Sequence, residues 1–171
     1  ESRRPVTISL LQQHGQPDGW RALMGQIDEA NAEGLRITAQ IRSRPTSVLL
    51  GLELSQNPFI HRKSYKQIGR LPFPERLARL RDPELRARIL SESFDGPARA
   101  RRIERWDRMY PFIDPPEYEP PASRSVTAIA AARGADVWET FLDLLLADDG
   151  RELLNSPVLN YADGNLDAAR T

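Results

Sequence analysis

Few residues of this chain carry chemistry of their own. His14 and His61 are its two histidines, and cysteine is absent. Two imidazoles cannot by themselves build a three-histidine zinc site, and the lack of cysteine excludes disulfides, thiolate metal sites and a cysteine nucleophile. The sequence also lacks the GxGxxG, P-loop, HExxH, GxSxG and HxH motifs. We therefore expect no complete catalytic constellation within the 171 residues, and we assign no catalytic or metal-ligating residue.

Arg42 and Arg44 are the candidates for binding a substrate. They follow a strand-like segment, and parallel α/β folds place their chemistry at the carboxyl ends of strands. The i, i+2 spacing points both guanidinium groups to the same side, where together they could hold a carboxylate. The alternative is a pair of solvated or ion-paired arginines.

The other polar candidates have plainer alternatives. His14 lies in a loop after the first strand-like segment, where it could be a metal ligand or a general base, or simply a polar loop residue. His61 lies among basic neighbours and has no apparent partner in the sequence. Asp148 and Asp149 precede a glycine at a predicted helix end, where we expect solvated carboxylates, and Asp163 lies in a predicted turn.

The N-terminal residues predict a βαβ unit. Residues 6–11 (VTISLL) are β-rich and apolar on both faces, which is typical of a buried parallel strand. Asp18 can cap a helix that Gly34 ends, and residues 35–41 (LRITAQI) indicate a second strand. The helix carries an amphipathic stripe of Trp20, Leu23, Met24 and Ile27. A helix between two strands makes the strands a parallel pair.

The rest of the chain alternates between irregular and helical stretches. Residues 43–73 predict an irregular loop with short pieces of structure, and residues 97–108 form a charged helix candidate. Residues 109–123 contain five prolines and must be extended or turning. A short strand is expected at residues 158–161.

Four further helices are predicted from their first residues. Pro74 suits the first helical position, and Asp82, Ser125 and Asp136 suit N-caps. Glu139, three residues after Asp136, completes a capping-box arrangement. The apolar faces of three of these helices comprise Leu77, Leu80, Leu85, Ile89, Val137, Phe141, Leu144 and Leu145.

Charge is uneven along a chain whose 24 basic and 24 acidic residues balance. Residues 61–108 hold fourteen basic and seven acidic groups, and residues 109–171 hold four basic and eleven acidic ones. The overall balance argues against a globally basic nucleic-acid binder. The uneven segments indicate either faces that are solvated or pair with each other, or a basic patch that binds a partner. No apolar run approaches the roughly 18 residues of a membrane helix.

Eight phrases follow one another along the chain: VTISLLQ, IDEANAEGLRITAQIRSRPTSVLLGL, NPF, SY, LPFPERLARLRDPELRARIL, SVTAIAAARG, ETFLDLLLADDG and NYADGNLDAAR. In this order they resemble the D-aminoacylase branch of the amidohydrolase superfamily, the N-acyl-D-amino-acid deacylases. The resemblance implies an internal segment of a longer (β/α)8-barrel enzyme. It also implies a zinc ion that activates the water attacking an amide carbonyl, with an aspartate as acid and base.

Two strand ends differ from the family pattern. Typical members have Ser-His where this chain has Ser9-Leu10, and His14 lies four residues past that place. They also have a histidine near the end of the next barrel strand, where this chain has AQIRSRP. The chain therefore looks like a divergent branch that lost metal ligands or that builds its site differently. We expect zinc in the parent family but none bound by this fragment.

We thus expect an α/β, mostly helical fold: a partial (β/α)8-barrel segment with a helical, proline-rich insertion. Residues 1–44 would be the βαβ piece, 45–122 the insertion over the barrel mouth, and 123–171 the helical return. The cytoplasmic parent would hydrolyse the N-acyl amide bond of N-acyl-D-amino acids, and the fragment would be inactive. Expected partners are the rest of the parent chain, that small molecule and a second copy at a strand edge, but no nucleic acid or membrane. The alternative is a non-enzymatic helical interaction module for an acidic partner.

Overall fold

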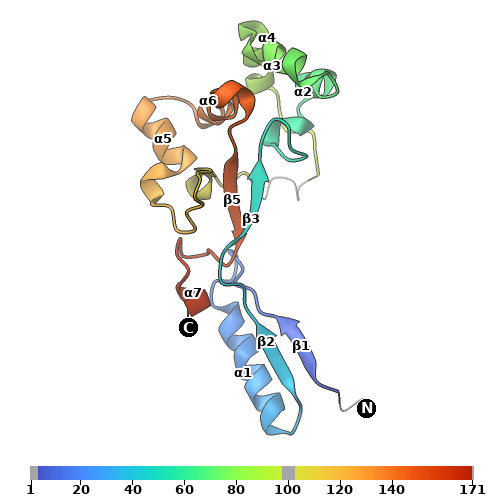
Figure 1. The fold of residues 1–171 in the computed structure, drawn as a ribbon, viewed down its shortest axis with the longest axis vertical. Coiled ribbons are helices and arrows are strands. Elements are labelled where there is room, and N and C mark those ends of the chain that lie inside the picture. The colour runs from blue at the N-terminus through green and yellow to red at the C-terminus, as the bar shows by residue number, and fades with distance from the viewer. Residues whose placement is uncertain (1–3, 98–102, 171) are drawn as a thin grey trace. The chain divides into compact units, whose positions relative to one another are not determined.

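A computed structural model describes residues 4–97 and 103–170, and in it the chain opens with a parallel βαβ unit (Figure 1). Strand β1 (Val6–Ser9) leads through a loop to helix α1 (Gly19–Ala32), and strand β2 (Ile37–Gln40) follows. The two strands are parallel neighbours, with Val6 opposite Ile37. Gly34, whose φ of 93° favours glycine, turns the chain from α1 towards β2. The predicted βαβ unit is confirmed.

The apolar faces of this βαβ unit are less buried than the sequence predicts. β1 is mostly exposed, and Val6 retains 49% of its surface. On α1, Ile27 is buried but Leu23 is exposed, as is Ile41 after β2. The cause is that β1 and β2 form a two-stranded sheet among the described residues, and one helix packs against β2. The expectation of a buried parallel strand at residues 6–11 is therefore wrong for this chain.

The chain divides into two units. One comprises Glu1–Ser47 and Pro157–Thr171, and the other comprises Val48–Ser156. The first border lies three residues after the predicted one at residue 44, whereas the predicted border at residue 122 falls inside the second unit. Helix accounts for 46% and strand for 14%, which agrees with the predicted mostly helical α/β class, and no closed barrel forms in the described part. No helix in that part is both long and apolar enough to cross a membrane.

The second unit, Val48–Ser156, consists mainly of helices beside a three-stranded sheet. The strand order is β3 (Thr46–Leu50), β5 (Leu154–Leu159) and β4 (Tyr110–Pro111), and β4 is antiparallel to β5. Its described α-helices are α2 (Lys63–Ile68), α3 (Phe73–Arg81), α4 (Pro83–Ser91), α5 (Val126–Arg133) and α6 (Val137–Gly150). Its short 3₁₀ segments include η1 (Pro58–His61), η3 (Trp106–Arg108) and η4 (Ala122–Arg124). Helix α7 (Asp167–Arg170) belongs to the other unit.

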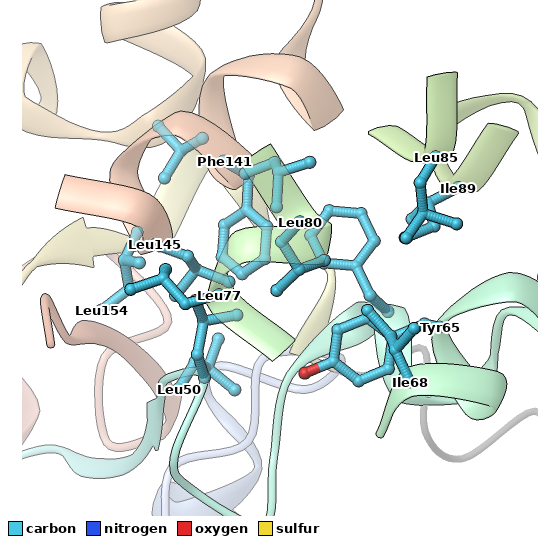
Figure 2. Close-up of a cluster of buried hydrophobic side chains, with 14 of the residues drawn as sticks. Leu50, Tyr65, Ile68, Leu77, Leu80, Leu85, Ile89, Phe141, Leu145 and Leu154 are labelled. Atoms are coloured by element: carbon cyan, nitrogen blue, oxygen red, sulfur yellow. The ribbon is translucent and has the colours of Figure 1, made fainter. Parts of the chain in front are cut away.

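One hydrophobic cluster fills the second unit (Figure 2). Phe141 on α6 is fully buried, with ring centroids 5.6 Å from Phe59 and 5.1 Å from Trp106. The cluster includes Leu50, Leu77, Leu80, Leu85, Ile89, Leu142, Leu145 and Leu154. The predicted burial of the α3 and α4 faces is confirmed. On α6, Leu142 and Leu145 are fully buried, whereas Val137 and Leu144 are partly buried.

Three predicted N-caps are confirmed by side-chain hydrogen bonds. The Asp82 carboxylate accepts from the Leu85 amide over 2.9 Å at the start of α4. The Ser125 hydroxyl accepts from the Ala128 amide over 3.2 Å at the start of α5. The carboxylate of Asp136 accepts from two amides of α6, the nearer over 2.8 Å. Each bond satisfies a helix N–H that has no partner within the helix.

Other stretches differ from their sequence predictions. Residues 43–73 contain strand β3 in addition to short helical segments, and β5 begins at Leu154, four residues before the predicted strand. Of the helix candidate at 97–108, residues 98–102 lie outside the described residues, and residues 103–108 contain η3 rather than an α-helix. Residues 109–123 are extended and turning, as five prolines require.

Thr140 offers a test of how the second unit is packed. It is fully buried on α6, and its hydroxyl has no hydrogen-bond partner among the described residues. An unsatisfied buried hydroxyl is costly, so we expect Thr140→Val to raise the free energy of unfolding by about 1 kcal/mol. Urea unfolding measures the difference. Thr140→Ser, which keeps the hydroxyl and loses the methyl group, is the matched control and should be less stable than the wild type. A valine variant less stable than the wild type would refute the prediction.

Candidate functional site

A network of amide groups lies just past the carboxyl ends of β1 and β5, within the unit Glu1–Ser47 and Pro157–Thr171. The Gln12 main-chain N–H donates to Oδ1 of Asn160 over 2.8 Å, and the Asn160 N–H donates to the Gln12 carbonyl over 2.9 Å. The Gln12 side chain extends the network, because Nε2 donates to Oδ2 of Asp163 over 2.8 Å. Its Oε1 accepts from the Ala162 N–H over 3.0 Å. Four hydrogen bonds thus join segments 148 to 151 residues apart.

Local backbone geometry accounts for asparagine at position 160. Asn160 directly follows β5 and has a φ of 58°, a left-handed conformation that asparagine adopts more readily than most residues. Its exposed fraction is 2%, and that of Gln12 is 3%. Buried amides need hydrogen-bond partners, so the network fixes both side chains.

One atom of the network has no such partner. Nδ2 of Asn160 is buried and makes no hydrogen bond with any described residue. The opposite arm of the same carboxamide is held by Gln12. Few buried polar groups in folded proteins lack a partner, and those that do often mark a site for a water or a ligand. Nδ2 carries N–H donors and therefore fits an acceptor oxygen.

Arg42 and Arg44 lie in the bend that follows β2, and both are exposed. Nη1 of Arg42 donates to the hydroxyl of Thr46 over 3.2 Å. The two arginines therefore follow a parallel strand, as the sequence indicates, and lie outside its regular part. Exposed guanidinium groups in this position can attract and hold a carboxylate.

His14 and His61 lie in different units of the chain, and Asp163 lies near Gln12. His14 is half-buried in a tight turn where the Gln16 N–H donates to the Gln13 carbonyl over 3.1 Å. His61, in the other unit, packs edge-on against Phe94 with ring centroids 5.1 Å apart. Asp163 lies in a turn, as predicted, and also contributes an acceptor to the amide network.

Zinc fits these strand ends poorly. The polar side chains after β1 are the amides of Gln12 and Gln13 and the imidazole of His14, and those after β2 include two guanidinium groups. Among these, the single imidazole is the usual zinc ligand, and one ligand does not make a zinc site. The amide of Gln12 is already engaged at both of its polar atoms. Across the described ranges 4–97 and 103–170, no group of three or more histidine, aspartate or glutamate side chains is placed to hold a metal ion.

A second polar cluster, in the unit Val48–Ser156, surrounds the buried Arg62. Its Nη1 donates to the carbonyls of Ile89 and Leu90 at the end of α4, the latter over 2.8 Å. Its guanidinium lies 4.1 Å from the ring centroid of Trp138. Burial lowers the pKa of Arg62, and three nearby carboxylates oppose that shift: Glu104, Glu92 and Asp136. Through these contacts Arg62 connects α4 with Trp138 of α6, and its role is structural.

The basic segment at residues 61–108 is partly neutralised from within. Arg86 forms ion pairs with Asp143 and Glu139 on α6, at 2.5 and 3.7 Å. Arg81 pairs with Asp149 at 2.9 Å. These pairs join the basic middle to the acidic last third, so they favour internally paired faces over a basic patch kept for a partner.

Gln12 and Asn160 are the residues that sequence reasoning missed. Gln12 follows a strand-like segment, which is the signal that singled out the two arginines, whereas Asn160 falls inside the strand predicted at residues 158–161 and follows β5 only in the structure. Uncharged amides gave no further reason to select them. Comparisons of the chain with models of protein families, with curated proteins and with solved structures found no match.

Proposed function

We propose that this chain is a segment of a D-aminoacylase-like amidohydrolase, whose full-length protein hydrolyses the N-acyl amide bond of N-acyl-D-amino acids. In this proposal the βαβ unit is two successive strands of a (β/α)8 barrel with the helix between them. The segment alone has no activity, because it lacks a complete catalytic constellation. The observation that carries the proposal is the parallel pairing of β1 with β2, with functional polar groups placed after the strands.

The exposed apolar side chains of the βαβ unit also support a barrel. Barrel strands have neighbours on both edges and helices outside them. Here Val6 on β1 and Ile41 after β2 are exposed, and Leu23 on α1 is exposed too. Further strands and helices of a barrel would cover such side chains. The amphipathic and β-rich patterns that predict burial then agree with the proposed parent.

Arg42 and Arg44 are the proposed substrate-binding residues. At neutral pH the fixed charge of an N-acyl amino acid is its carboxylate, and two guanidinium groups after a barrel strand suit that charge. The role assigned to these residues is to bind and orient the substrate.

The test is a kinetic comparison in the full-length protein that contains this chain. A panel of N-acyl-D-amino acids and their L-enantiomers establishes the best substrate. Arg42→Ala and Arg44→Ala are then measured for kcat/KM and thermal stability. Loss of a charge-assisted contact should reduce kcat/KM by about 10- to 150-fold in at least one variant.

Arg21→Ala is the matched control, because Arg21 is an exposed arginine of the same unit that pairs with Asp18 at 3.5 Å. It should leave kcat/KM unchanged. The carboxylate-binding role is wrong if both Arg42→Ala and Arg44→Ala keep the kcat/KM of the wild type. The proposed activity itself is wrong if no N-acyl-D-amino acid is hydrolysed.

A further inference from the structure

We propose that Nδ2 of Asn160 binds the acyl carbonyl oxygen of the substrate, with Gln12 as the residue that positions the carboxamide. This inference rests on the proposed function and adds a second, uncharged contact to the carboxylate contact assigned to the arginines. It comes from one observation: a carboxamide fixed at Oδ1 whose other arm is a buried donor with no described partner.

The direction of Nδ2 is fixed by the network. Oδ1 of Asn160 accepts from the Gln12 main-chain N–H over 2.8 Å, and the Asn160 main chain bonds back to Gln12 over 2.9 Å. A flip of the carboxamide would place Nδ2 against the Gln12 N–H, two donors facing each other, so the observed orientation is enforced. Gln12 itself is held by Asp163 and Ala162. A donor held in this way is preorganised for an acceptor.

The chemistry of the surroundings selects a neutral acceptor. Asn160 is 2% exposed, and burying a carboxylate without a cation costs far more than burying a carbonyl. The Asp163 carboxylate belongs to the same network and repels a second anion. In an N-acyl amino acid, the acyl carbonyl is the neutral acceptor and the carboxylate is the anionic one. The carbonyl therefore suits Asn160, whereas the carboxylate suits exposed Arg42 and Arg44.

Access to Nδ2 requires a local movement. The atom has essentially no exposed surface in this structure, so the carbonyl can reach it when the residues covering it open. Local openings cost less than global unfolding and are common in binding segments. Once bound, the carbonyl oxygen satisfies a donor that is otherwise unpaired, and that gain offsets part of the cost of opening.

The experiment uses the full-length protein and its best N-acyl-D-amino acid. Asn160→Asp keeps the shape and Oδ1 but replaces the donor with an acceptor. We expect kcat/KM to fall by about tenfold or more, because the hydrogen bond is lost and a carboxylate faces the carbonyl. Gln13→Ala is the control, since Gln13 is an exposed neighbour of Gln12. It should retain the kcat/KM of the wild type.

Competition by two ligands shows whether Asn160 contacts the acyl carbonyl or the carboxylate of the substrate. N-acetyl-D-leucine carries a carboxylate, and N-acetyl-D-leucinamide has the same acyl carbonyl but no charge. If Asn160 binds the acyl carbonyl, Asn160→Asp weakens both ligands, and N-acetyl-D-leucine more strongly because the new carboxylate also repels its charge. Weakening confined to the carboxylate ligand would assign Asn160 to the carboxylate and overturn the inference. Unchanged binding of both would mean that Nδ2 holds a buried water, and would also overturn it.

A second variant distinguishes loss of the hydrogen bond from a folding defect. Asn160→Gly accommodates the φ of 58° and removes the donor without adding charge. Its free energy of unfolding should fall, because the Gln12 N–H loses Oδ1 as its acceptor, so affinity is measured under conditions where the variant is folded. The folded variant should lose affinity for both ligands, and intact affinity would contradict the inference. The two proposals fail differently. A wild type that hydrolyses no member of the panel refutes the function and the inference together, whereas an active wild type with an equally active Asn160→Asp variant refutes the inference alone.

Discussion

Truncation of Phe141 to alanine should lower the free energy of unfolding by about 3–5 kcal/mol. Phe141 is fully buried in the hydrophobic cluster of Val48–Ser156 (Figure 2). Its ring packs against Phe59 and Trp106. Removing the ring loses its burial and leaves a cavity that well-packed neighbours fill incompletely. Urea unfolding of the full chain, followed by tryptophan fluorescence, measures the change because Trp106 lies against the ring.

Two companion variants show whether the loss comes from burial. Phe141→Leu keeps much of the apolar volume and should lose less than half as much stability as the alanine variant. Leu144→Ala lies on the same helix at a partly buried position, so we expect a loss between that of Phe141→Ala and that of an exposed site. Equal losses for Leu144→Ala and Phe141→Ala would contradict the placement of the buried face of α6.

Three helix starts were predictable because each depends on a few neighbouring residues, whereas Asp18 makes no side-chain capping bond at α1, and α3 begins at Phe73, one residue before Pro74. A side-chain oxygen of Asp82, Ser125 or Asp136 bonds an amide two or three residues later, so sequence alone contains both partners. Strand β3 was not predictable in this way. It is five residues long, and its partner β5 comes from the far end of the chain. A short strand without a local partner carries little signal of its own.

The identity of the buried residues was also predictable only in part. A helical stripe shows which residues share a face, but tertiary packing decides which edge of that face is deepest. On α6 the cluster lies against Leu142 and Leu145, so Leu144 stays partly buried although it belongs to the same apolar run. On α1 of the βαβ unit, Ile27 of the predicted stripe is buried, whereas Leu23 is exposed because the described chain does not fully cover that face.

The residues of the candidate site also differ in whether they could be predicted from the sequence. Arg42 and Arg44 could be selected because charge and position after a strand are both visible in sequence. The Gln12–Asn160 network could not, because its partners are neutral and lie 148 residues apart. The orphan donor on Asn160 depends further on a left-handed backbone and complete burial, and neither can be read from an Asn-Tyr dipeptide.

Gln12 is the other position where a large effect is expected. Gln12→Leu preserves the size of the side chain but removes the acceptor of the Ala162 N–H and the donor to Asp163. Ala162 is buried, so its N–H would be left without a partner. We expect a loss of about 2–4 kcal/mol from the unpaired amide and the lost hydrogen bonds. Urea unfolding measures it, and hydrogen exchange should show faster exchange of the Ala162 amide. Gln13→Leu, at an exposed position, should change neither.

Gln12→Glu then tests the contact with Asp163 through its pH dependence. This variant keeps an oxygen for the Ala162 N–H but places a second carboxylate at the position from which Nε2 donates over 2.8 Å. Two carboxylates so close share a proton, so the folded variant binds that proton more tightly than the unfolded chain does. Its stability should therefore fall as pH rises from the ordinary carboxyl pKa of about 4 through the higher pKa of the shared proton, and stay low at neutral pH. Relative to the wild type, the stability deficit should be smallest below that range. A deficit that is the same in acid and at neutral pH would mean that Gln12 does not hold Asp163 through its amide.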